Sequence, residues 1–260
     1  MSNTTFTTNP NYKGLLFLDC RKWSHEMERL LYHSLPHSTQ SGPWPIHCIL
    51  PLPNCSESIV LYDDNQFYHS NYQTLTTLFR DDLVVPFEYR MICQALDSLN
   101  GFQKRRHPFI VCDYVLFPLG AAQHSIWLNP ASIVDIWEEN SLSYIVMASG
   151  PGLIVPVSVD IIQKYASNAL LAFACSERDL PGTRSFSGRK PLDFLELPDT
   201  PFIRSLISRG DLQTFPILEG EYRHYYFLKK AINDVLETVE ESGLDVFDTE
   251  TLADLLNNNK

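Results

Sequence analysis

Basic residues are scarce in this sequence of 260 residues, which has 20 Lys and Arg against 31 Asp and Glu and a formal net charge of −11. This balance has the wrong sign for an ordinary nucleic-acid binder, because phosphate backbones attract positively charged surfaces. Glycine is also scarce at 11 residues, whereas Phe and Tyr number 15 and 12. The hydrophobic content of 44% excludes wholesale disorder, and the many aromatic residues indicate a strand-rich interior.

Membrane spans, secretion signals and disulfide patterns are missing as well. The polar residues 1–10 do not resemble a signal peptide, and no run approaches the roughly 18 apolar residues of a transmembrane helix. No two cysteines have C-x-x-C spacing, which favours free, buried thiols in a reducing compartment. We therefore expect a cytoplasmic protein without membrane contact. The cysteines are Cys20, Cys48, Cys55, Cys93, Cys112 and Cys175.

The motifs of common enzymes fail when their residues are checked. His25 and Glu26 begin an H-E-x-x-H pattern, but Arg29 stands where the second zinc ligand would be. Lys190 resembles the lysine of a phosphate-binding loop, but Pro191 replaces the Ser or Thr that would hold Mg²⁺. Ser149 lacks the flanking glycines of a nucleophile elbow and fits a hairpin turn better.

Metal ligands and paired carboxylates give no better evidence for catalysis. His47 and Cys48 with Cys55 form the nearest cluster of metal-ligating types, but their spacing matches no standard site. Adjacent acids such as Asp63 and Asp64 lie beside turn signals, which is typical of solvated loops. We therefore expect no enzyme, no bound metal and no cofactor.

Hydrophobic patterning predicts mainly strands before residue 158 and helices after it. A strand at 15–19 precedes a helix whose apolar face contains Trp23, Met27, Leu30 and Leu31. The apolar run 109–117 predicts one central strand ended by a proline, whereas 87–96 fits a helix or a strand. Linkers too short for parallel crossovers predict antiparallel connections. Further strands are expected at 58–62, 67–68, 126–128, 133–137, 143–147 and 153–157.

The second half of the chain predicts helices. Ser158 is placed to begin a helix over 159–173, and further helices are expected at 200–209 and 223–239. The first should direct inward Ile161, Ile162, Tyr165, Ala169, Leu170 and Phe173, and the last carries a stripe of Leu228, Ala231, Ile232, Val235 and Val239.

These elements predict an α+β fold, with a mainly antiparallel sheet core, an N-terminal helix and several C-terminal helices. We divide the chain into a strand–helix extension (1–45), a β-rich core (46–176), and a basic loop followed by an acidic helical region (177–260). Residues 231–260 alone contain eight acidic residues and one lysine, so much of the negative charge lies at this end.

One basic cluster interrupts the acidic sequence after the turn residues Asn100 and Gly101. Its position between an amphipathic segment and a long apolar run is typical of a loop that projects from a sheet. Such a cluster fits either a solvated loop or a contact with phosphates, and arginine suits the narrow, strongly negative minor groove. The cluster consists of Gln103, Lys104, Arg105, Arg106 and His107.

A second basic segment contains Arg184, Arg189 and Lys190. Its Gly, Ser and Thr neighbours are expected to leave backbone N–H groups free for phosphate. A solvated linker to the C-terminal helices fits this segment better than a phosphate site does. We carry both segments forward as candidate DNA-binding residues.

The order of features resembles the bacterial competence transcription factor ComK family over about residues 46–176. The resemblance begins with Cys93 and the basic cluster, continues with the strand ending at Pro118 and the polar loop before Trp127, and ends where Pro156 and its valine neighbours lead into a helix. It rests on order and spacing and covers roughly half of the chain.

This resemblance implies a cytoplasmic DNA-binding activator of competence genes, which control DNA uptake. Such proteins recognise A/T-rich boxes from the minor-groove side of double-stranded DNA and bind as homodimers that form higher oligomers. The family is also delivered to a Clp protease by an adaptor. The acidic balance and the amphipathic C-terminal helix leave a second interpretation open: a non-enzymatic protein-interaction regulator that keeps the ComK-like fold without binding DNA.

Overall fold

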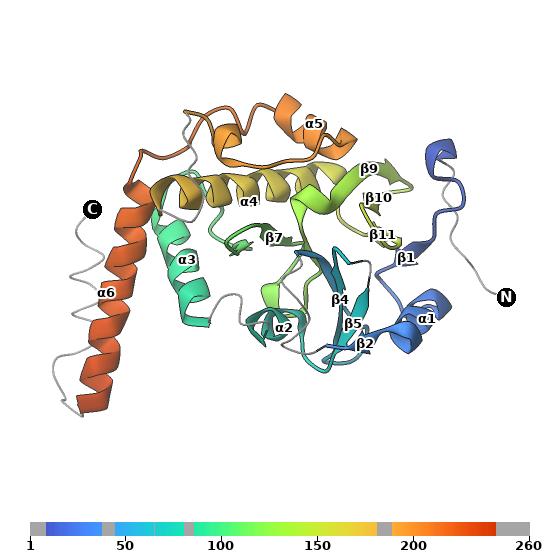
Figure 1. The fold of residues 1–260 in the computed structure, drawn as a ribbon, viewed down its shortest axis with the longest axis horizontal. Coiled ribbons are helices and arrows are strands. Elements are labelled where there is room, and N and C mark those ends of the chain that lie inside the picture. Colours follow the sequence, from blue (N-terminus) through green and yellow to red (C-terminus); the bar gives the residue numbers. More distant parts are fainter. Residues whose placement is uncertain (1–8, 38–44, 65, 81–85, 181–188, 243–260) are drawn as a thin grey trace.

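Two β-sheets flanked by helices form the body of the protein (Figure 1). The computed structural model describes residues 9–37, 45–64, 66–80, 86–180 and 189–242. Among these residues, only two strand pairings are parallel and all others are antiparallel. This arrangement confirms the predicted α+β fold with mainly antiparallel sheets.

The larger sheet is built around a buried hairpin formed by β3 (Ile46–Pro51) and β4 (Ser58–Tyr62). β4 turns back into β5 (Phe67–Ser70), so the predicted turn between these two strands is confirmed. The remaining strands extend the sheet on both sides of this unit. The order is β2 (Leu35–Pro36), β5, β4, β3, β8 (Trp127–Leu128), β7 (Val115–Pro118) and β6 (Phe109–Ile110).

The apolar run 109–117 does not form the single central strand that its composition predicts. The backbone N–H of Val111 donates to the carbonyl of Tyr114 at 3.0 Å, so β6 and β7 form an antiparallel hairpin at the edge of the sheet. Cys112 and Asp113 are exposed at the turn. Asp113 is charged and therefore favours an exposed turn. The apolar residues on both sides of the turn make the segment look like one continuous strand.

The smaller sheet is an antiparallel meander completed by an N-terminal strand. β9 (Ile133–Glu139), β10 (Leu142–Met147) and β11 (Gly152–Val155) follow one another as their short linkers predict. β1 (Phe17–Asp19) pairs parallel with β11, with Phe17 opposite Gly152. A Cβ atom on Gly152 would lie 2.3 Å from the Phe17 ring, so only glycine allows this packing.

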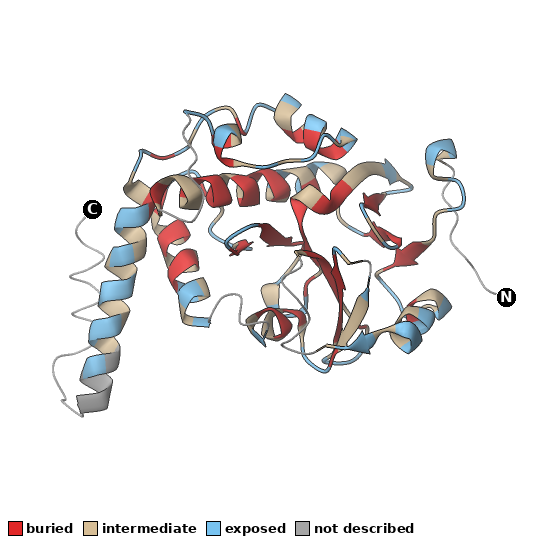
Figure 2. Ribbon diagram, viewed as in Figure 1, coloured by how far each residue is buried: buried red, intermediate tan, exposed pale blue. Residues whose placement is uncertain are grey.

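Helix α4 (Val159–Asp179) lies across the body between β7 and α5 and is buried along much of its length (Figures 1 and 2). Its predicted start is confirmed, because Ser158 is the N-cap residue. Ile162 is fully buried, but Ile161 is 40% exposed, so the prediction that both point inward is wrong. Successive helical residues are rotated by about 100°, so the two neighbours cannot share one narrow face.

The other helices surround this core. α3 (Pro86–Ser98) resolves the ambiguity over 87–96, and α5 (Pro201–Ser208) confirms the helix expected at 200–209. Trp23 precedes α1 and is 43% exposed, so its expected place on that helix's apolar face is wrong. Other helical segments are α1 (His25–His33), α2 (Thr74–Arg80), α6 (Glu221–Ser242), η1 (Pro10–Tyr12), η2 (Ala122–His124), η3 (Pro130–Ser132) and η4 (Pro191–Phe194).

Helix α6 stands beside α3 at one end of the molecule, with a largely exposed outer face (Figure 2). α6 confirms the helix expected at 223–239, and helical spacing places the predicted stripe on one face. This face is only partly covered: Leu228 and Ile232 are half-buried, whereas Ala231 and Val235 are exposed. The side chain of Val239 lies outside the described residues.

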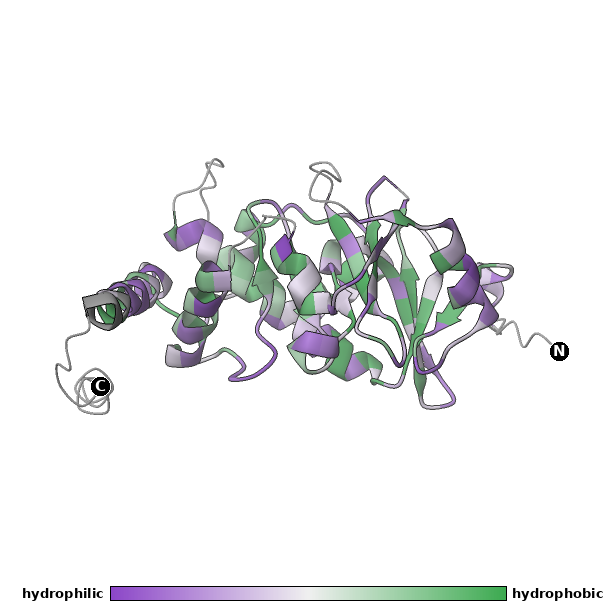
Figure 3. Ribbon diagram, turned by 90° about the horizontal axis from the view of Figure 1, so that it is seen from below, coloured by the Kyte–Doolittle hydropathy of each residue, from purple (hydrophilic) through white to green (hydrophobic). Residues whose placement is uncertain are grey.

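All three predicted segments contribute to the main hydrophobic core. Leu18 from 1–45, Phe117 from 46–176, and Phe202 and Tyr222 from 177–260 belong to the same cluster of buried side chains. Hydrophobic residues accordingly line the strands throughout the body of the protein (Figure 3). The division of the chain into three segments stays a prediction, but their packing is continuous.

The cysteines are unpaired thiols, but not all of them are buried. Cys48 and Cys175 are buried, whereas Cys55 and Cys112 are exposed, so the expectation of burial is wrong for those two. Burial raises the pKa of Cys20 and Cys93 to about 12. Within the described part of the chain, no helix is long and apolar enough to cross a membrane.

Candidate nucleic-acid interface

The basic loop, residues 103–107, is held at both ends by buried neighbours. Phe102 precedes it and Pro108 follows it, and both are buried. Gly101 lies between the end of α3 and the basic loop and has a φ of +98°. A Cβ atom at this position would lie 2.7 Å from Pro216. Glycine is required for both the backbone conformation and this close approach. The loop therefore leaves the core at a defined point.

Three adjacent cations of this loop, Lys104, Arg105 and Arg106, are exposed. Lys104 donates from Nζ to the backbone carbonyl of Asp97, and the Arg106 guanidinium lies 4.9 Å from the centroid of the Tyr165 ring. Among the residues that the structure describes, no carboxylate forms an ion pair with these three side chains. Their charges are therefore available to an external anion.

Arg106 has an uncommon backbone conformation. Its φ is +62°, in the left-handed region that costs a residue with a Cβ atom about 1–2 kcal/mol. The stacking of its guanidinium on Tyr165 helps to offset this cost. Backbone strain of this kind gathers at functional sites, because the surrounding structure must hold it for a reason other than stability.

His107 and Gln103, the two ends of the loop, are more enclosed than the cations. His107 Nε2 lies 3.2 Å from Asp97 Oδ1, and burial lowers the pKa of this imidazole. Its backbone carbonyl accepts a hydrogen bond from the Tyr89 hydroxyl at 3.4 Å. Gln103 is half-buried. We therefore place the predicted contact function on the three central residues and an anchoring role on His107.

The second basic segment is arranged differently. Arg184 lies outside the described residues, whereas the side chains of Arg189 and Lys190 are exposed. The backbone N–H groups of Arg189 and Lys190 both donate to Asp193 Oδ2, at 2.8 and 3.0 Å. These hydrogen bonds lower the pKa of Asp193. The expectation of free backbone donors is wrong here, because a carboxylate of the chain itself occupies them.

Arg178, at the start of the 177–260 segment where a loop is predicted, belongs to the core instead. α4 continues to Asp179, and the Arg178 guanidinium pairs with that carboxylate at 2.7 Å and lies 4.0 Å from the centroid of the Phe215 ring. The first residues of the predicted loop are therefore helix, and Arg178 forms its contacts within the protein.

The two basic segments are anchored close together. Gly101, before the first, abuts Pro216, and the Phe194 ring, after the second, packs 5.6 Å from that of the adjacent Phe215. The run of three cations identifies the basic loop in the sequence. Tyr165 carries no comparable signal, because it becomes a neighbour of Arg106 only through folding. Asp193 follows Lys190 by three residues, and this spacing, typical of a helix start, was the available signal for its role.

Buried histidine also links the two sheets. His47 on β3 bonds through Nε2 to Asp63 Oδ1 at 3.0 Å and through Nδ1 to Ser149 Oγ at 2.8 Å. Burial lowers the pKa of His47, so its neutral ring donates from Nε2 and accepts from the Ser149 hydroxyl. Ser149 lies in the turn between β10 and β11, as predicted. These bonds satisfy a buried imidazole and connect the sheets.

Metal-ligating side chains are dispersed: the described residues include no group of three or more His, Cys, Asp or Glu that could hold a metal ion. No family model, curated protein or solved structure matches the chain. The function is therefore inferred from the geometry of the site and from the order of features in the sequence.

Proposed function

We propose that this chain is a DNA-binding transcriptional activator of the ComK type, which recognises A/T-rich promoter boxes of competence genes. The observation that carries the proposal is the basic loop, whose three exposed cations lack carboxylate partners among the described residues. A local positive field attracts phosphate even on a protein of negative net charge. Strain at Arg106 is a second argument that the loop is held for contact.

Minor-groove recognition suits so short a loop. A·T and T·A base pairs present nearly the same acceptors in this groove, so its width carries much of the information and few base-specific side chains are needed. We expect Arg105 and Arg106 to enter the groove, where each also neutralises one phosphate at its edge, and Lys104 to contact a phosphate outside it. A homodimer or higher oligomer would repeat these contacts along the DNA. A cytoplasmic location and delivery to a Clp protease by an adaptor belong to the same proposal.

The direct test measures binding of the full chain to A/T-rich and G/C-rich duplexes of equal length by gel shift and fluorescence anisotropy. We expect a preference for the A/T-rich duplex. The K104A/R105A/R106A variant should lose binding, and the slope of log K against log[salt] should decrease by about 2.7 if each cation contacts one phosphate.

The matched control is K13A/K22A/R29A, which removes three exposed cations near α1, at the end of the molecule away from α3 (Figure 1). It makes the same change in net charge and should retain nearly wild-type affinity. Equal affinities of the two triple variants, with circular dichroism showing both to be folded, would contradict the assignment to the basic loop.

A protein-interaction regulator without DNA binding is the second candidate, and α6 favours it. Phe227 and Val235 on this helix are 52% and 51% exposed, and Leu218 just before it is 78% exposed. Large apolar side chains that remain exposed along one helix can be covered by a partner protein. Absence of any gel shift at micromolar protein and low salt, with either duplex, would favour this candidate over the DNA-binding activator.

A further inference from the structure

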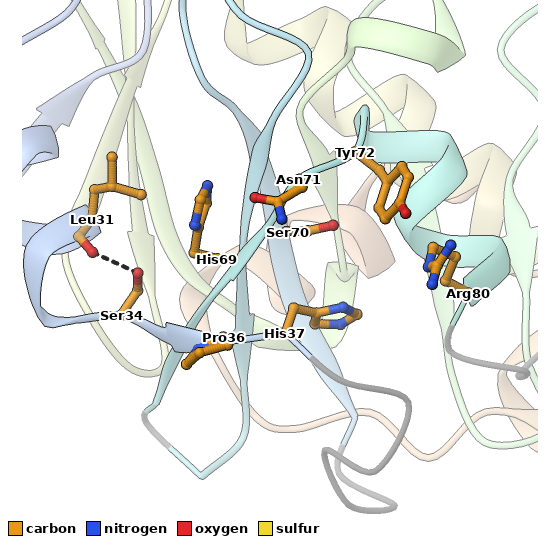
Figure 4. A pocket seen from close by; sticks show the side chains of 9 residues that line it. All are labelled: Leu31, Ser34, Pro36, His37, His69, Ser70, Asn71, Tyr72 and Arg80. Atoms are coloured by element: carbon orange, nitrogen blue, oxygen red, sulfur yellow. Dashed lines mark hydrogen bonds between the residues drawn. The ribbon is translucent and has the colours of Figure 1, made fainter.

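A cavity of about 500 Å³ opens between the end of α1, β2 and β5 and the end of α2 (Figure 4). Its volume is in the range that accommodates a small organic ligand. Arg80 and Tyr72 lie together at one side in this view, Leu31 lies at the other, and His37 and Asn71 lie between them. We call this cavity the α1–α2 pocket.

Positive charge and hydrogen-bond donors dominate its described lining. The Arg80 guanidinium lies 4.3 Å from the centroid of the Tyr72 ring. Arg80 forms no ion pair and Asn71 makes no side-chain hydrogen bond among the residues that the structure describes. No Asp or Glu belongs to this lining. Within the described part of the pocket, the charge of Arg80 therefore has no carboxylate partner.

The two histidines of the pocket are fixed by partners on the sheet. His37 Nε2 lies 2.9 Å from the Tyr62 hydroxyl, and His69 Nε2 lies 3.0 Å from Glu57 Oε2. Glu57, 39% exposed, is thus paired with an imidazole. These bonds hold the rings in place and leave Arg80 and Asn71 as the principal donors for a ligand.

We propose that the α1–α2 pocket binds a small phosphate monoester, with the phosphate on Arg80 and the organic part toward Asn71, Leu31 and Pro36. A guanidinium offers two parallel N–H donors to phosphate oxygens, and its stacking on an aromatic ring preserves that orientation. The Asn71 amide, which lies on the His69 side of the pocket, can donate to a polar group of the organic part (Figure 4). The proposal is independent of DNA binding by the basic loop.

The same phosphate chemistry occurs in DNA, so the test separates the two sources. Inorganic phosphate, AMP and glucose 6-phosphate are titrated into the full chain by calorimetry, with adenosine and glucose as probes that lack the phosphate. We expect both phosphate monoesters to bind, inorganic phosphate to bind more weakly, and adenosine and glucose not to bind.

Arg80→Gln should weaken binding of the monoesters at least tenfold. Arg29→Gln on α1 removes an exposed arginine outside the pocket and should leave it unchanged, as should K104A/R105A/R106A. Tyr72→Leu, which removes the stacked ring, should weaken binding less than Arg80→Gln, and Tyr72→Phe should restore it.

Absence of binding by AMP and glucose 6-phosphate, or equal binding by the wild type and Arg80→Gln, would overturn the proposal. If Arg80→Gln instead lowers affinity for A/T-rich DNA while neither monoester binds, the pocket receives the DNA backbone and the small-molecule proposal is wrong. Loss of DNA binding by the basic-loop variant alone does not affect these outcomes, so the two proposals fail separately.

Discussion

The two basic segments of this acidic chain are alike in composition, but they differ in which groups remain available to bind a ligand. In the basic loop, Lys104 donates to a backbone carbonyl and Arg106 lies over a ring, so the charges remain available. In the second segment, the side chains of Arg189 and Lys190 are exposed as well, but Asp193 accepts from the backbone N–H groups of both residues. A carboxylate of the chain itself thus occupies the backbone donors of the second segment and adds a negative charge beside its cations.

The largest difference should appear when equal charge is removed from each segment. R105A/R106A should weaken DNA binding at least tenfold and lower the salt slope by about 1.8, because two phosphate contacts are lost. R189A/K190A makes the same change in net charge and should cost no more than about threefold, since only long-range attraction is reduced. Fluorescence anisotropy at several salt concentrations measures both. Equal losses would remove the distinction between the segments.

Arg106→Gly separates charge from backbone strain within the basic loop. Glycine adopts the observed φ of +62° freely, so the variant should recover about 1 kcal/mol relative to Arg106→Ala, which keeps the strain. Both variants lose the guanidinium and should bind DNA equally weakly. Urea denaturation measures the difference in stability. If Arg106→Ala proves as stable as Arg106→Gly, the left-handed conformation carries no cost here.

Asp193→Ala tests the second segment in the opposite direction. Removing the carboxylate frees two backbone N–H donors and one negative charge, so DNA affinity should rise by roughly two- to threefold at low salt and less at high salt. Asp199→Ala provides the control, because it removes an exposed carboxylate that pairs with Arg204 and does not contact this segment. An equal rise in both variants would show a general charge effect.

The smallest expected effect is on the pH dependence of stability. The basic loop and the second segment should respond in different pH ranges. Burial holds the pKa of His107 below its ordinary value of 6.5, so the unfolded chain takes up the proton first and stability falls as the pH decreases below about 6.5. The pKa of Asp193 lies below 3.8, so its stabilising contribution is present above that value and is lost only in stronger acid.

Urea midpoints between pH 8 and pH 5 should therefore depend less on pH in His107→Gln than in the wild type, while Asp193→Ala should leave this dependence unchanged. His47 is also buried with a lowered pKa and contributes in the same direction, so some dependence should remain in His107→Gln. Identical slopes for His107→Gln and the wild type would contradict the assignment.

The sequence correctly predicts those strands and helices whose hydrophobic pattern agrees with their burial in the fold. The strands at 58–62 and 143–147 alternate with clear turns and are confirmed, as is the helix that begins after Ser158. The prediction of a single strand over 109–117 is wrong because a two-residue turn interrupts an otherwise apolar segment. Asp113 is the one charged residue of this segment. The prediction that Arg178 lies in a loop is wrong because the end of a helix and a loop have the same polar composition.

The basic loop is predictable from the sequence, but its surroundings are not. Three consecutive cations stand out in an acidic chain, whereas the stacking of Arg106 on Tyr165 joins residues that are 59 positions apart and follows from helix packing. The α1–α2 pocket escapes prediction for the same reason, because Arg80 and His37 belong to separate elements with ordinary sequences.

The parallel pairing of β1 with β11 has a consequence for how the chain folds. Phe17 meets Gly152, so β1 must find a partner strand that lies 135 positions further along the chain. Contacts of such sequence separation slow folding and leave an open sheet edge in the meantime. A variant that lacks residues 1–19, and with them β1, would expose β11 as a permanent edge of the sheet and should aggregate more readily.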